Sequence, residues 1–345
     1  MAQGQTNLET WMGSIRNDVD DVLRRFFESK RDEAGGLSPH ANDLVDEVRD
    51  LTMRGGKRLR PIVTAAAYRA VSGDTNTRPI LEIGASLELL QSYLLIHDDW
   101  MDEDDERRGG PAVHFAFAKR HGDRHLGESL GVLAGDLAST FSWELFLASP
   151  LPEHRRTEAL RTFVDIQKEV FAGQQLDLIA DDDVERMHRL KTGSYTTRGP
   201  AELGGIAGDA DDSAMRALRG WSLPLGIAFQ LRDDLLSTFA NAQQTGKPGD
   251  DLQHGKHNAV IGAFRKSGPS ESDKRIVDRA WGNAAASDDE VSEATRVLLS
   301  AKGCVEARLR ALVEEATKAL DESPFDADAR ALLDEVTRML TDRGT

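Results

Sequence analysis

Two pairs of adjacent aspartates, Asp98-Asp99 and Asp233-Asp234, are the residues whose type and spacing best suit chemistry. Asp102 follows Asp98 by four residues, so on a helix both carboxylates lie on one face, roughly 5–6 Å apart at Cβ. Carboxylates at this spacing repel each other unless a cation lies between them. Oxygen ligands favour a hard ion, and Mg²⁺ typically takes one or two carboxylates together with phosphate oxygens and water. The spacing predicts a magnesium site, with an acid-rich helix end in solvent as the alternative.

Basic residues near the first acidic block suit the phosphates that such a metal would accompany. Arg107-Arg108 follows the block directly, and a guanidinium group binds phosphate oxygens in a fork. Lys57 and Arg60 lie beside Gly55-Gly56 and would point the same way if a helix begins there. In this acidic chain, four of the 43 lysines and arginines fall within residues 54–60. That density favours an anion site over a basic turn in solvent.

The elements that carry these residues are predicted to be helices throughout. Apolar residues between Leu8 and Phe26 step by three and four, which is typical of an amphipathic helix, and Gly35–Pro39 is expected to end it. No alternating strand pattern, linker or repeat interrupts the helices. We therefore expect one all-α domain over residues 1–345, an antiparallel bundle. Further helices are expected at about 41–53, 62–72, 80–102, 112–120, 127–147, 154–179, 210–240 and 257–266, with three more in the last third.

Composition narrows the class of protein. The formal net charge is −16, which argues against nucleic acid as a partner because phosphate backbones need basic surfaces. The single cysteine, Cys304, cannot form an intrachain disulfide and points to a reducing, cytoplasmic compartment. No run reaches the roughly eighteen uncharged apolar residues of a membrane span, and no signal peptide is readable. A soluble enzyme fits these bounds, and a salt-adapted source would also explain the charge.

The two acidic helix ends can be interpreted as parts of one site. Each closes an apolar helical run, and two such helices facing each other across a bundle could hold metal ions that clamp a polyphosphate. No Ser-His-Asp arrangement, Walker loop or Cys/His zinc spacing competes with this interpretation. His97, next to the first pair, is interpreted as a supporting or structural residue. The cations that would neutralise the phosphates are Lys57, Arg60, Arg107, Arg108, Lys191, Lys247 and Lys256.

Six short motifs follow one another along the chain. They are Gly55–Pro61, Asp98–Asp102 with Arg107–Gly109, Lys191-Thr192, Phe229-Gln230 with Asp233-Asp234, Gly246-Lys247 and Gly255-Lys256. Their order and spacing resemble the trans-isoprenyl diphosphate synthases, the polyprenyl synthetase family, over about residues 40–265. The helices expected at about 270–342 lie beyond this match. The resemblance implies an all-α fold of antiparallel helices around a deep central cavity, and usually a homodimer.

The resemblance implies head-to-tail condensation of isopentenyl diphosphate onto dimethylallyl, geranyl or farnesyl diphosphate. This reaction needs a leaving group and no nucleophilic side chain, because the allylic C–O bond ionises with the help of Mg²⁺. By the resemblance, Asp98, Asp102 and Asp233 would hold the magnesium ions, about three in each active site. The released diphosphate would take the final proton, so no protein base is required.

The resemblance also assigns roles to the surrounding polar residues. The carbonyls of Lys191 and Thr192, together with Gln230, would ease the carbocation. The residues that would bind the allylic diphosphate and add positive charge as its bond breaks are Arg107, Lys191, Lys247 and Lys256. The residues that would bind isopentenyl diphosphate are Lys57, Arg60, Gln91 and Arg108.

Departures from the family pattern keep alternatives open. Ser237 stands where relatives commonly carry a third aspartate of the second acidic motif, and Gln91 stands where many carry His. Asp233, Ser237 and Asn241 are spaced by four, which echoes the metal motif of class I terpene cyclases, although a Glu is expected at Asn241. A cyclase, or a non-catalytic cation-binding helical protein, is the alternative to a prenyltransferase.

The expected product length depends on a residue near the first acidic block. Tyr93 lies five residues before Asp98, and by family analogy a bulky residue there closes the floor of the cavity. This pattern is most typical of enzymes that make geranylgeranyl diphosphate, with farnesyl diphosphate as the near alternative. Tyr93 would serve equally as plain core packing.

Overall fold

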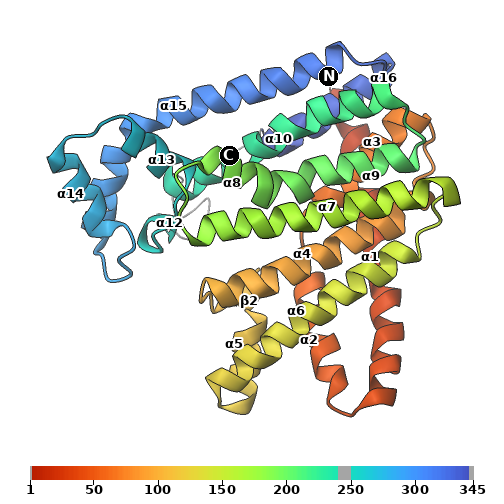
Figure 1. Cartoon of the computed structure of the whole chain (residues 1–345), viewed down its shortest axis with the longest axis horizontal. Helices are drawn as coiled ribbons and strands as arrows, with labels where there is room; N and C mark the ends of the chain where they lie inside the picture. The colour runs from red at the N-terminus through yellow and green to blue at the C-terminus, as the bar shows by residue number, and fades with distance from the viewer. Residues whose placement is uncertain (1, 240–249, 342–345) are drawn as a thin grey trace. The chain divides into compact units, whose positions relative to one another are not determined.

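The structure, a computed structural model, describes residues 2–239 and 250–341. Its long elements are all helices, and the described residues contain one short two-stranded hairpin (Figure 1). The contacts divide the chain into two compact units: unit 1 comprises Met1–Ala159 and Leu203–Asp209, and unit 2 comprises Leu160–Glu202 and Ala210–Thr345. The predicted all-α fold class is confirmed, whereas the single domain and the central cavity stay predictions.

Unit 1 is built around α4 (Leu81–Met101), which packs against α1, α3 and α6. Apolar residues occur on every side of α4, as expected for a helix that is buried all round. Leu87, Leu89 and Leu90 have no exposed surface. The other elements of this unit are α1 (Ala2–Leu37), α2 (Ala41–Met53), α3 (Leu59–Ser72), η1 (Arg78–Ile80), α5 (Val113–His121) and α6 (Arg124–Leu147), with parts of α7 (Glu153–Leu178) and α9 (Gly199–Ala207).

The same central helix is apolar enough to raise the question of a membrane. Arg78–Met101 is the one segment of the described residues whose length and composition would allow it to cross a bilayer. However, 72% of its most apolar window is buried inside the structure, so it is a core helix. Glycines let α6 approach it closely: a Cβ added at Gly135 would lie 2.2 Å from Nε2 of His97.

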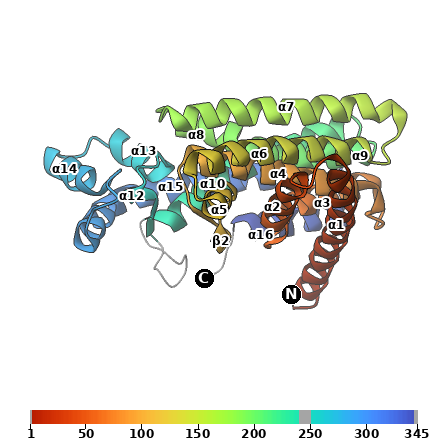
Figure 2. The ribbon, with the colours of Figure 1, turned by 90° about the horizontal axis from the view of Figure 1, so that it is seen from below.

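Unit 2 is organised around the pairing of α10 (Asp212–Phe239) with α15 (Asp288–Asp321). The buried Trp221 of α10 donates its Nε1–H to the hydroxyl of Thr337 at 2.8 Å, which ties in the last helix. Helix α14 packs on α15 (Figures 1 and 2). The remaining elements of this unit are α8 (Val184–His188), the π-helical η2 (Arg189–Arg198), α12 (Asp250–Gln253), α13 (Ala259–Lys266), α14 (Glu271–Ala280) and α16 (Ala327–Thr341).

The end of α1 falls within the predicted break, whereas the helical elements between Val184 and Ala207 and a short hairpin were not expected. Helix α1 continues through Gly35-Gly36 to Leu37, and the chain leaves it only at Ser38-Pro39. Glycine therefore weakened but did not end this helix, whereas proline did. The short hairpin of β1 (Glu106–Arg107) and β2 (Gly110–Pro111) was not expected, because two-residue strands are too short to show alternation.

Candidate active site

The acidic end of α4 has the geometry that the sequence predicts. The backbone N–H of Asp102 donates to the carbonyl of Asp98 at 2.8 Å, so the helix continues through both residues and their side chains share a face. Both side chains are partly buried. Asp99 is different, because its side chain has no exposed surface.

Asp99 holds an arginine in place. Nε of Arg107 donates to Oδ1 of Asp99 at 2.6 Å, and Nη2 of the same guanidinium also contacts Asp99 and lies 3.2 Å from Oδ2 of Asp104. Burial raises the pKa of Asp99 to about 6, against the opposing effect of Arg107. The sequence interpretation named Arg107 and missed the residue that positions it. Adjacent residues on a helix point in directions about 100° apart, so the second aspartate of a pair faces a different neighbour.

The hairpin after α4 directs the second arginine. Glu106 pairs with Pro111, and Arg107 with Gly110, so the two central residues of the turn are Arg108 and Gly109. Their φ angles are 53° and 71°, and positive φ at both positions is the mark of a type I′ turn. Nη1 of Arg108 then donates to the carbonyl of Leu51 at 3.2 Å.

A group of arginines surrounds the glycine pair that precedes α3. A Cβ added at Gly56 would lie 3.7 Å from Nη2 of Arg108, so the loop and the hairpin touch there. Burial lowers the pKa of Arg108 against the opposing charge of Glu88, and the charges of Arg58, Arg60 and Arg107 lower it further. Cations forced together in this way favour an anion among them. The structure thus brings together Arg60 and Arg108, two of the four residues predicted to bind isopentenyl diphosphate.

The other two residues of that prediction differ in exposure. Lys57 is exposed and its carbonyl accepts a hydrogen bond from Arg16, while Gln91 is buried on α4. Within the described part of the chain, Oε1 of Gln91 has no hydrogen-bond partner. Arg58, between Lys57 and Arg60, is structural: its buried guanidinium binds Glu88 at 2.8 Å and Asp20 at 2.8 Å.

In unit 2 the predicted pair Lys191 and Thr192 lies in the π-helical segment η2. Such segments are rare and occur frequently at functional sites. Nζ of Lys191 donates to Oδ2 of Asp177 at 2.5 Å, and the hydroxyl of Thr192 donates to Oε1 of Gln230 at 2.9 Å. The structure therefore joins Thr192 to Gln230, while their role beside a carbocation stays a prediction.

The two aspartates of the second pair differ in burial, as those of the first pair do. Asp233 is partly buried, whereas Asp234 is 3% exposed and accepts hydrogen bonds from Gln230 Nε2 at 2.9 Å and from the backbone N–H of Ala259 at 2.8 Å. Nε2 of His188 lies 3.2 Å from Oδ2 of Asp234. Asp234 thus connects α8, α10 and α13. The sequence singled out Asp234 as a member of the second pair but gave it no role of its own, and it did not single out His188.

The loop that carries Lys256 is fixed by the turn before α15. Gly255 and Gly282 both have positive φ, and a Cβ added at Gly255 would lie 2.9 Å from Cα of Gly282. Nε1 of Trp281 donates to the carbonyl of Lys256 at 3.5 Å. Lys247 and Asn241 lie outside the described residues.

A metal would need ligands in addition to the side chains. The described residues contain no group of three or more His, Cys, Asp or Glu side chains arranged to hold an ion. Asp98 and Asp102 offer only oxygen donors, which suits Mg²⁺ completed by phosphate and water. The hydroxyl of Ser237 donates to the carbonyl of Asp234 at 3.1 Å, so it is directed at the backbone of its own helix.

Tyr93 lies in unit 1 on α4, the helix that also carries the first acidic pair. Its ring meets that of His97 edge to face, with the centroids 4.9 Å apart. His97 in turn lies 3.1 Å from the carbonyl of Val132 on α6, which agrees with a structural role. Burial raises the pKa of Tyr93. The role of Tyr93 in product length stays a prediction.

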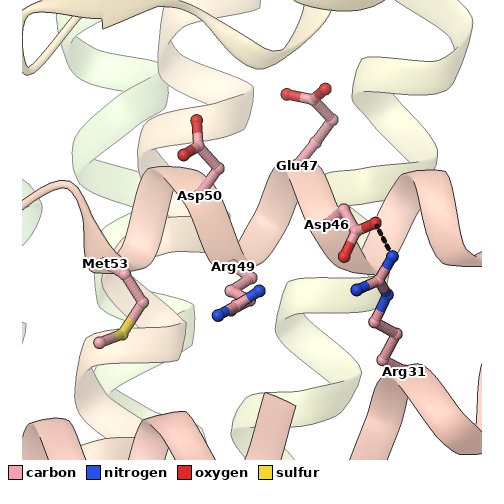
Figure 3. Close-up of a pocket in the computed structure, with 6 residues that line it drawn as sticks. All are labelled: Arg31, Asp46, Glu47, Arg49, Asp50 and Met53. Atoms are coloured by element: carbon pink, nitrogen blue, oxygen red, sulfur yellow. Dashed lines mark ion pairs between the residues drawn. The ribbon is translucent and has the colours of Figure 1, made fainter. Parts of the chain in front are cut away.

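A surface hollow of about 480 Å³ in unit 1 carries none of the predicted residues. Figure 3 shows its lining side chains, and their charges largely compensate each other. Arg31 pairs with Asp46 at 3.3 Å, and Arg54 binds Asp50 at 2.8 Å. With two guanidinium groups against three carboxylates, the lining has no excess of positive charge that would recognise a diphosphate. It is lined by Arg31, Asp46, Glu47, Arg49, Asp50 and Met53.

Comparison with known proteins accounts for this arrangement of acidic helix ends and arginines. The polyprenyl synthetase family matches residues 42–298, which is more than half of the chain. The chain belongs to the polyprenyl synthetase family. It is therefore a trans-prenyltransferase, and its relatives group it with the short-chain isoprenyl diphosphate synthases.

Three similar proteins illustrate the family. A short chain isoprenyl diphosphate synthase of Methanocaldococcus jannaschii is 29% identical over 293 residues, covering 83% of this polyprenyl synthetase and 82% of that protein. A geranylfarnesyl diphosphate synthase of Natronomonas pharaonis is 32% identical over 323 residues, covering 87% and 90%. The crystal structure of a geranylgeranyl pyrophosphate synthase from Corynebacterium glutamicum, complexed with isoprenyl diphosphate and magnesium, has a TM-score of 0.89 and 30% identity over 98% of this chain and 99% of that one.

Proposed function

We propose that this polyprenyl synthetase condenses isopentenyl diphosphate with dimethylallyl, geranyl and farnesyl diphosphate to give geranylgeranyl diphosphate. The observation that carries the proposal is the group of guanidinium ions around Gly56, which includes Arg60 and Arg108. An enzyme that joins two diphosphates needs a binding site for each, and this group suits one of them. The acidic helix ends, with their oxygen ligands, suit the metal-bound diphosphate of the other.

The metal ligands in this proposal are Asp98, Asp102 and Asp233. Their assignment rests on the family motifs in the sequence and on the partial burial of all three side chains, whereas Asp99 and Asp234 are engaged elsewhere. A similar enzyme from Corynebacterium glutamicum contains magnesium. Mg²⁺ would supply positive charge that stabilises the departing diphosphate. We propose about three ions for each active site.

Fixed cations share this task with the metal. Asp99 holds Arg107 and Asp177 holds Lys191, so both cations are positioned before substrate binds. Preorganised charge of this kind stabilises a leaving group without reorganisation during the reaction. Lys256 and Lys247 join these two in the proposal. Gln230, whose amide oxygen accepts from Thr192, would face the developing carbocation together with the carbonyls of Lys191 and Thr192.

The proposed isopentenyl diphosphate site consists of Lys57, Arg60, Gln91 and Arg108. Arg60 and Arg108 would bind the diphosphate oxygens in forks, and the exposed Lys57 would add a point charge. The amide of the buried Gln91 would complete the set, with its carbonyl oxygen available for a partner. No protein base enters the proposal, because the released diphosphate would accept the proton.

Product length is the finer part of the proposal. Tyr93 supports geranylgeranyl diphosphate, because a bulky, half-buried ring there would close the cavity floor. Farnesyl diphosphate is the near alternative, and the likeness to a geranylfarnesyl diphosphate synthase favours a longer product. A terpene cyclase is disfavoured by the direction of the Ser237 hydroxyl, which donates to its own helix.

The proposal also covers assembly and location. Leu126, Leu133 and Leu147 of α6 are 40%, 52% and 56% exposed, and exposed apolar side chains on one helix are typical of a protein interface. We propose that this face of α6 forms a homodimer. We further propose a cytoplasmic enzyme without a nucleic-acid partner, given the net charge of −16 and the single cysteine.

Incubation of the protein with isopentenyl diphosphate, each allylic primer and Mg²⁺ tests the proposal. Chromatography of the dephosphorylated lipid is expected to show geranylgeraniol, with no turnover once the metal is chelated. A cyclic hydrocarbon would favour the cyclase. Failure to consume isopentenyl diphosphate with any primer would contradict the proposed reaction.

A further inference from the structure

Unit 2 contains a cavity of about 370 Å³ that includes none of the residues assigned above. Elements α8, α10, α13 and α15 line it. This volume falls in the range of small-molecule sites, which are mostly apolar with a few polar groups. Its apolar walls are formed by Val184, Leu231, Ala259, Ala263, Ala301 and Val305.

The three charged side chains that line the cavity carry one more positive charge than negative charge. Arg308 binds Glu185 with two parallel contacts, Nη2 to Oε1 at 2.6 Å and Nε to Oε2 at 3.0 Å, and its Nη1 also donates to Oε1 of Glu315 at 3.1 Å. The carboxylate of Glu185 is therefore satisfied by Arg308. Lys266 is the third charged residue of the lining and is exposed. Among the described residues, no hydrogen bond to its ammonium group is found. An apolar hollow with one available ammonium group complements an apolar molecule with one anionic head.

The cavity also touches the elements that carry the proposed active site. Leu231 precedes Asp233 by two residues on α10, and Ala259 donates its backbone N–H to Asp234 at 2.8 Å. Val184 and Glu185 belong to α8, which runs directly into the segment of Lys191 and Thr192. A molecule in the cavity therefore contacts each of the three elements that Asp234 connects.

We propose that this cavity is a second ligand site, for a small amphiphile with a single anionic head. The apolar chain lies along the walls and the head binds Lys266. Occupancy shifts α8 and α13 against Asp234 and thereby changes turnover, a consequence that rests on the proposed function. Two sources share this chemistry, fatty carboxylates and isoprenyl monophosphates, and the test includes one probe of each.

The single cysteine of the chain provides the binding test, because Cys304 lines the cavity and is exposed. Its rate of alkylation by iodoacetamide is measured with and without sodium decanoate or geranyl monophosphate. We expect at least one probe to slow alkylation severalfold in a saturable manner; protection by only one identifies the source. Unchanged alkylation at saturating concentrations of both probes would overturn the site. This measurement does not require turnover, so it stays informative if the proposed function fails.

Lys266→Gln tests the head-group contact. Loss of a charged hydrogen bond is expected to raise the probe concentration for half-protection by about tenfold. Lys274→Gln is the matched control, because Lys274 is an exposed lysine of α14 outside the cavity, paired with Glu271. Equal effects of the two variants would show that the ammonium group of Lys266 does not bind the head.

Covalent occupancy tests the coupling to turnover. Reaction of Cys304 with N-decylmaleimide is expected to lower kcat severalfold while the KM for isopentenyl diphosphate stays unchanged, and N-methylmaleimide is expected to have a much smaller effect. The Cys304→Ser protein, treated in the same way, should not respond. A quantitatively labelled enzyme with unchanged kcat would overturn the coupling.

Discussion

At the scale of single residues, the two members of each aspartate pair differ in burial: the first is partly buried and the second is buried. Asp99 is buried and holds Arg107, and Asp234 is buried and accepts hydrogen bonds from Gln230 and Ala259. The preceding aspartate of each pair is partly buried and is proposed as a metal ligand. In the proposed site, the first carboxylate of each pair would face the substrate, while the second fixes the surrounding groups.

This division predicts different outcomes for neighbouring substitutions. Asp98→Ala and Asp233→Ala are expected to lower kcat by at least ~10²-fold with folding intact, because each removes charge that stabilises the leaving group. Asp234→Asn is expected to lower the free energy of unfolding by ~1–3 kcal/mol, because buried donors lose their acceptor. Steady-state kinetics and urea unfolding measure the two effects. Near-normal activity in either alanine variant would remove the metal assignment.

A second prediction concerns Tyr93. Tyr93→Ala is expected to lengthen the product, because the smaller side chain would open the floor below the growing chain. Tyr93→Phe is the control, since it keeps the ring and should keep the product. Chromatography of the lipids from both variants decides the matter. An unchanged product from the alanine variant would place the floor elsewhere.

The sequence identified candidate site residues but not the partners that hold them in place. Because Asp98 and Asp102 are four residues apart, helix geometry alone places them on one face, and this feature could be predicted from the sequence. The contact between Arg107 and Asp99 depends on a hairpin whose turn holds Arg108 at φ 53°. No local sequence pattern predicts a non-glycine residue in that conformation. The link from His188 to Asp234 likewise joins residues distant in sequence.

At the scale of elements, close packing between α4 and α6 positions the acidic end of α4. A side chain at Gly135 would collide with the ring of His97, only one residue before Asp98. The helix boundaries followed well from periodicity, as with α2 at Ala41–Met53. The end of α1 at Leu37 also falls within the break predicted at Gly35–Pro39, whereas the helical segment from Val184 to Ala207 was not predicted.

Two glycine substitutions test this packing. Gly135→Ala is expected to destabilise the protein by ~1–3 kcal/mol through overpacking against His97. Gly303→Ala is the matched control: it is also helical, nothing lies within 4 Å of its added Cβ, and it should stabilise by about 0.5–1 kcal/mol. Urea unfolding measures both. Equal changes in the two variants would contradict the close approach of α6 to α4.

At the scale of the whole molecule, the chain combines a strongly acidic composition with a small set of arginines and lysines at defined places. The net charge of −16 favours a soluble surface. The arginines beside Gly56 are buried or partly buried, which separates them from the acidic side chains of that surface. Exposed apolar side chains occur on this surface along α6 and also along α7, at Val164, Phe171 and Leu178. Association through those of α6 would cover part of that apolar area.

The proposed dimer is tested by light scattering coupled to size exclusion. The wild-type protein is expected to have about twice the chain mass of 37.9 kDa. Leu133→Glu, which places a charge in the proposed interface, is expected to give a monomer. Leu299→Glu is the control, because Leu299 is 50% exposed on α15 in the other unit. A monomeric wild type would refute the proposed assembly.

The central claim is that the first aspartate of each pair binds metal and the second does not. Anomalous diffraction from crystals grown with Mn²⁺ and a non-ionisable allylic thiolodiphosphate tests it most directly. The account predicts manganese coordinated by Asp98, Asp102 and Asp233 and by the diphosphate oxygens, with Asp99 still bound to Arg107. Manganese coordinated by Asp99 or Asp234, or absent from all three proposed ligands, would contradict it.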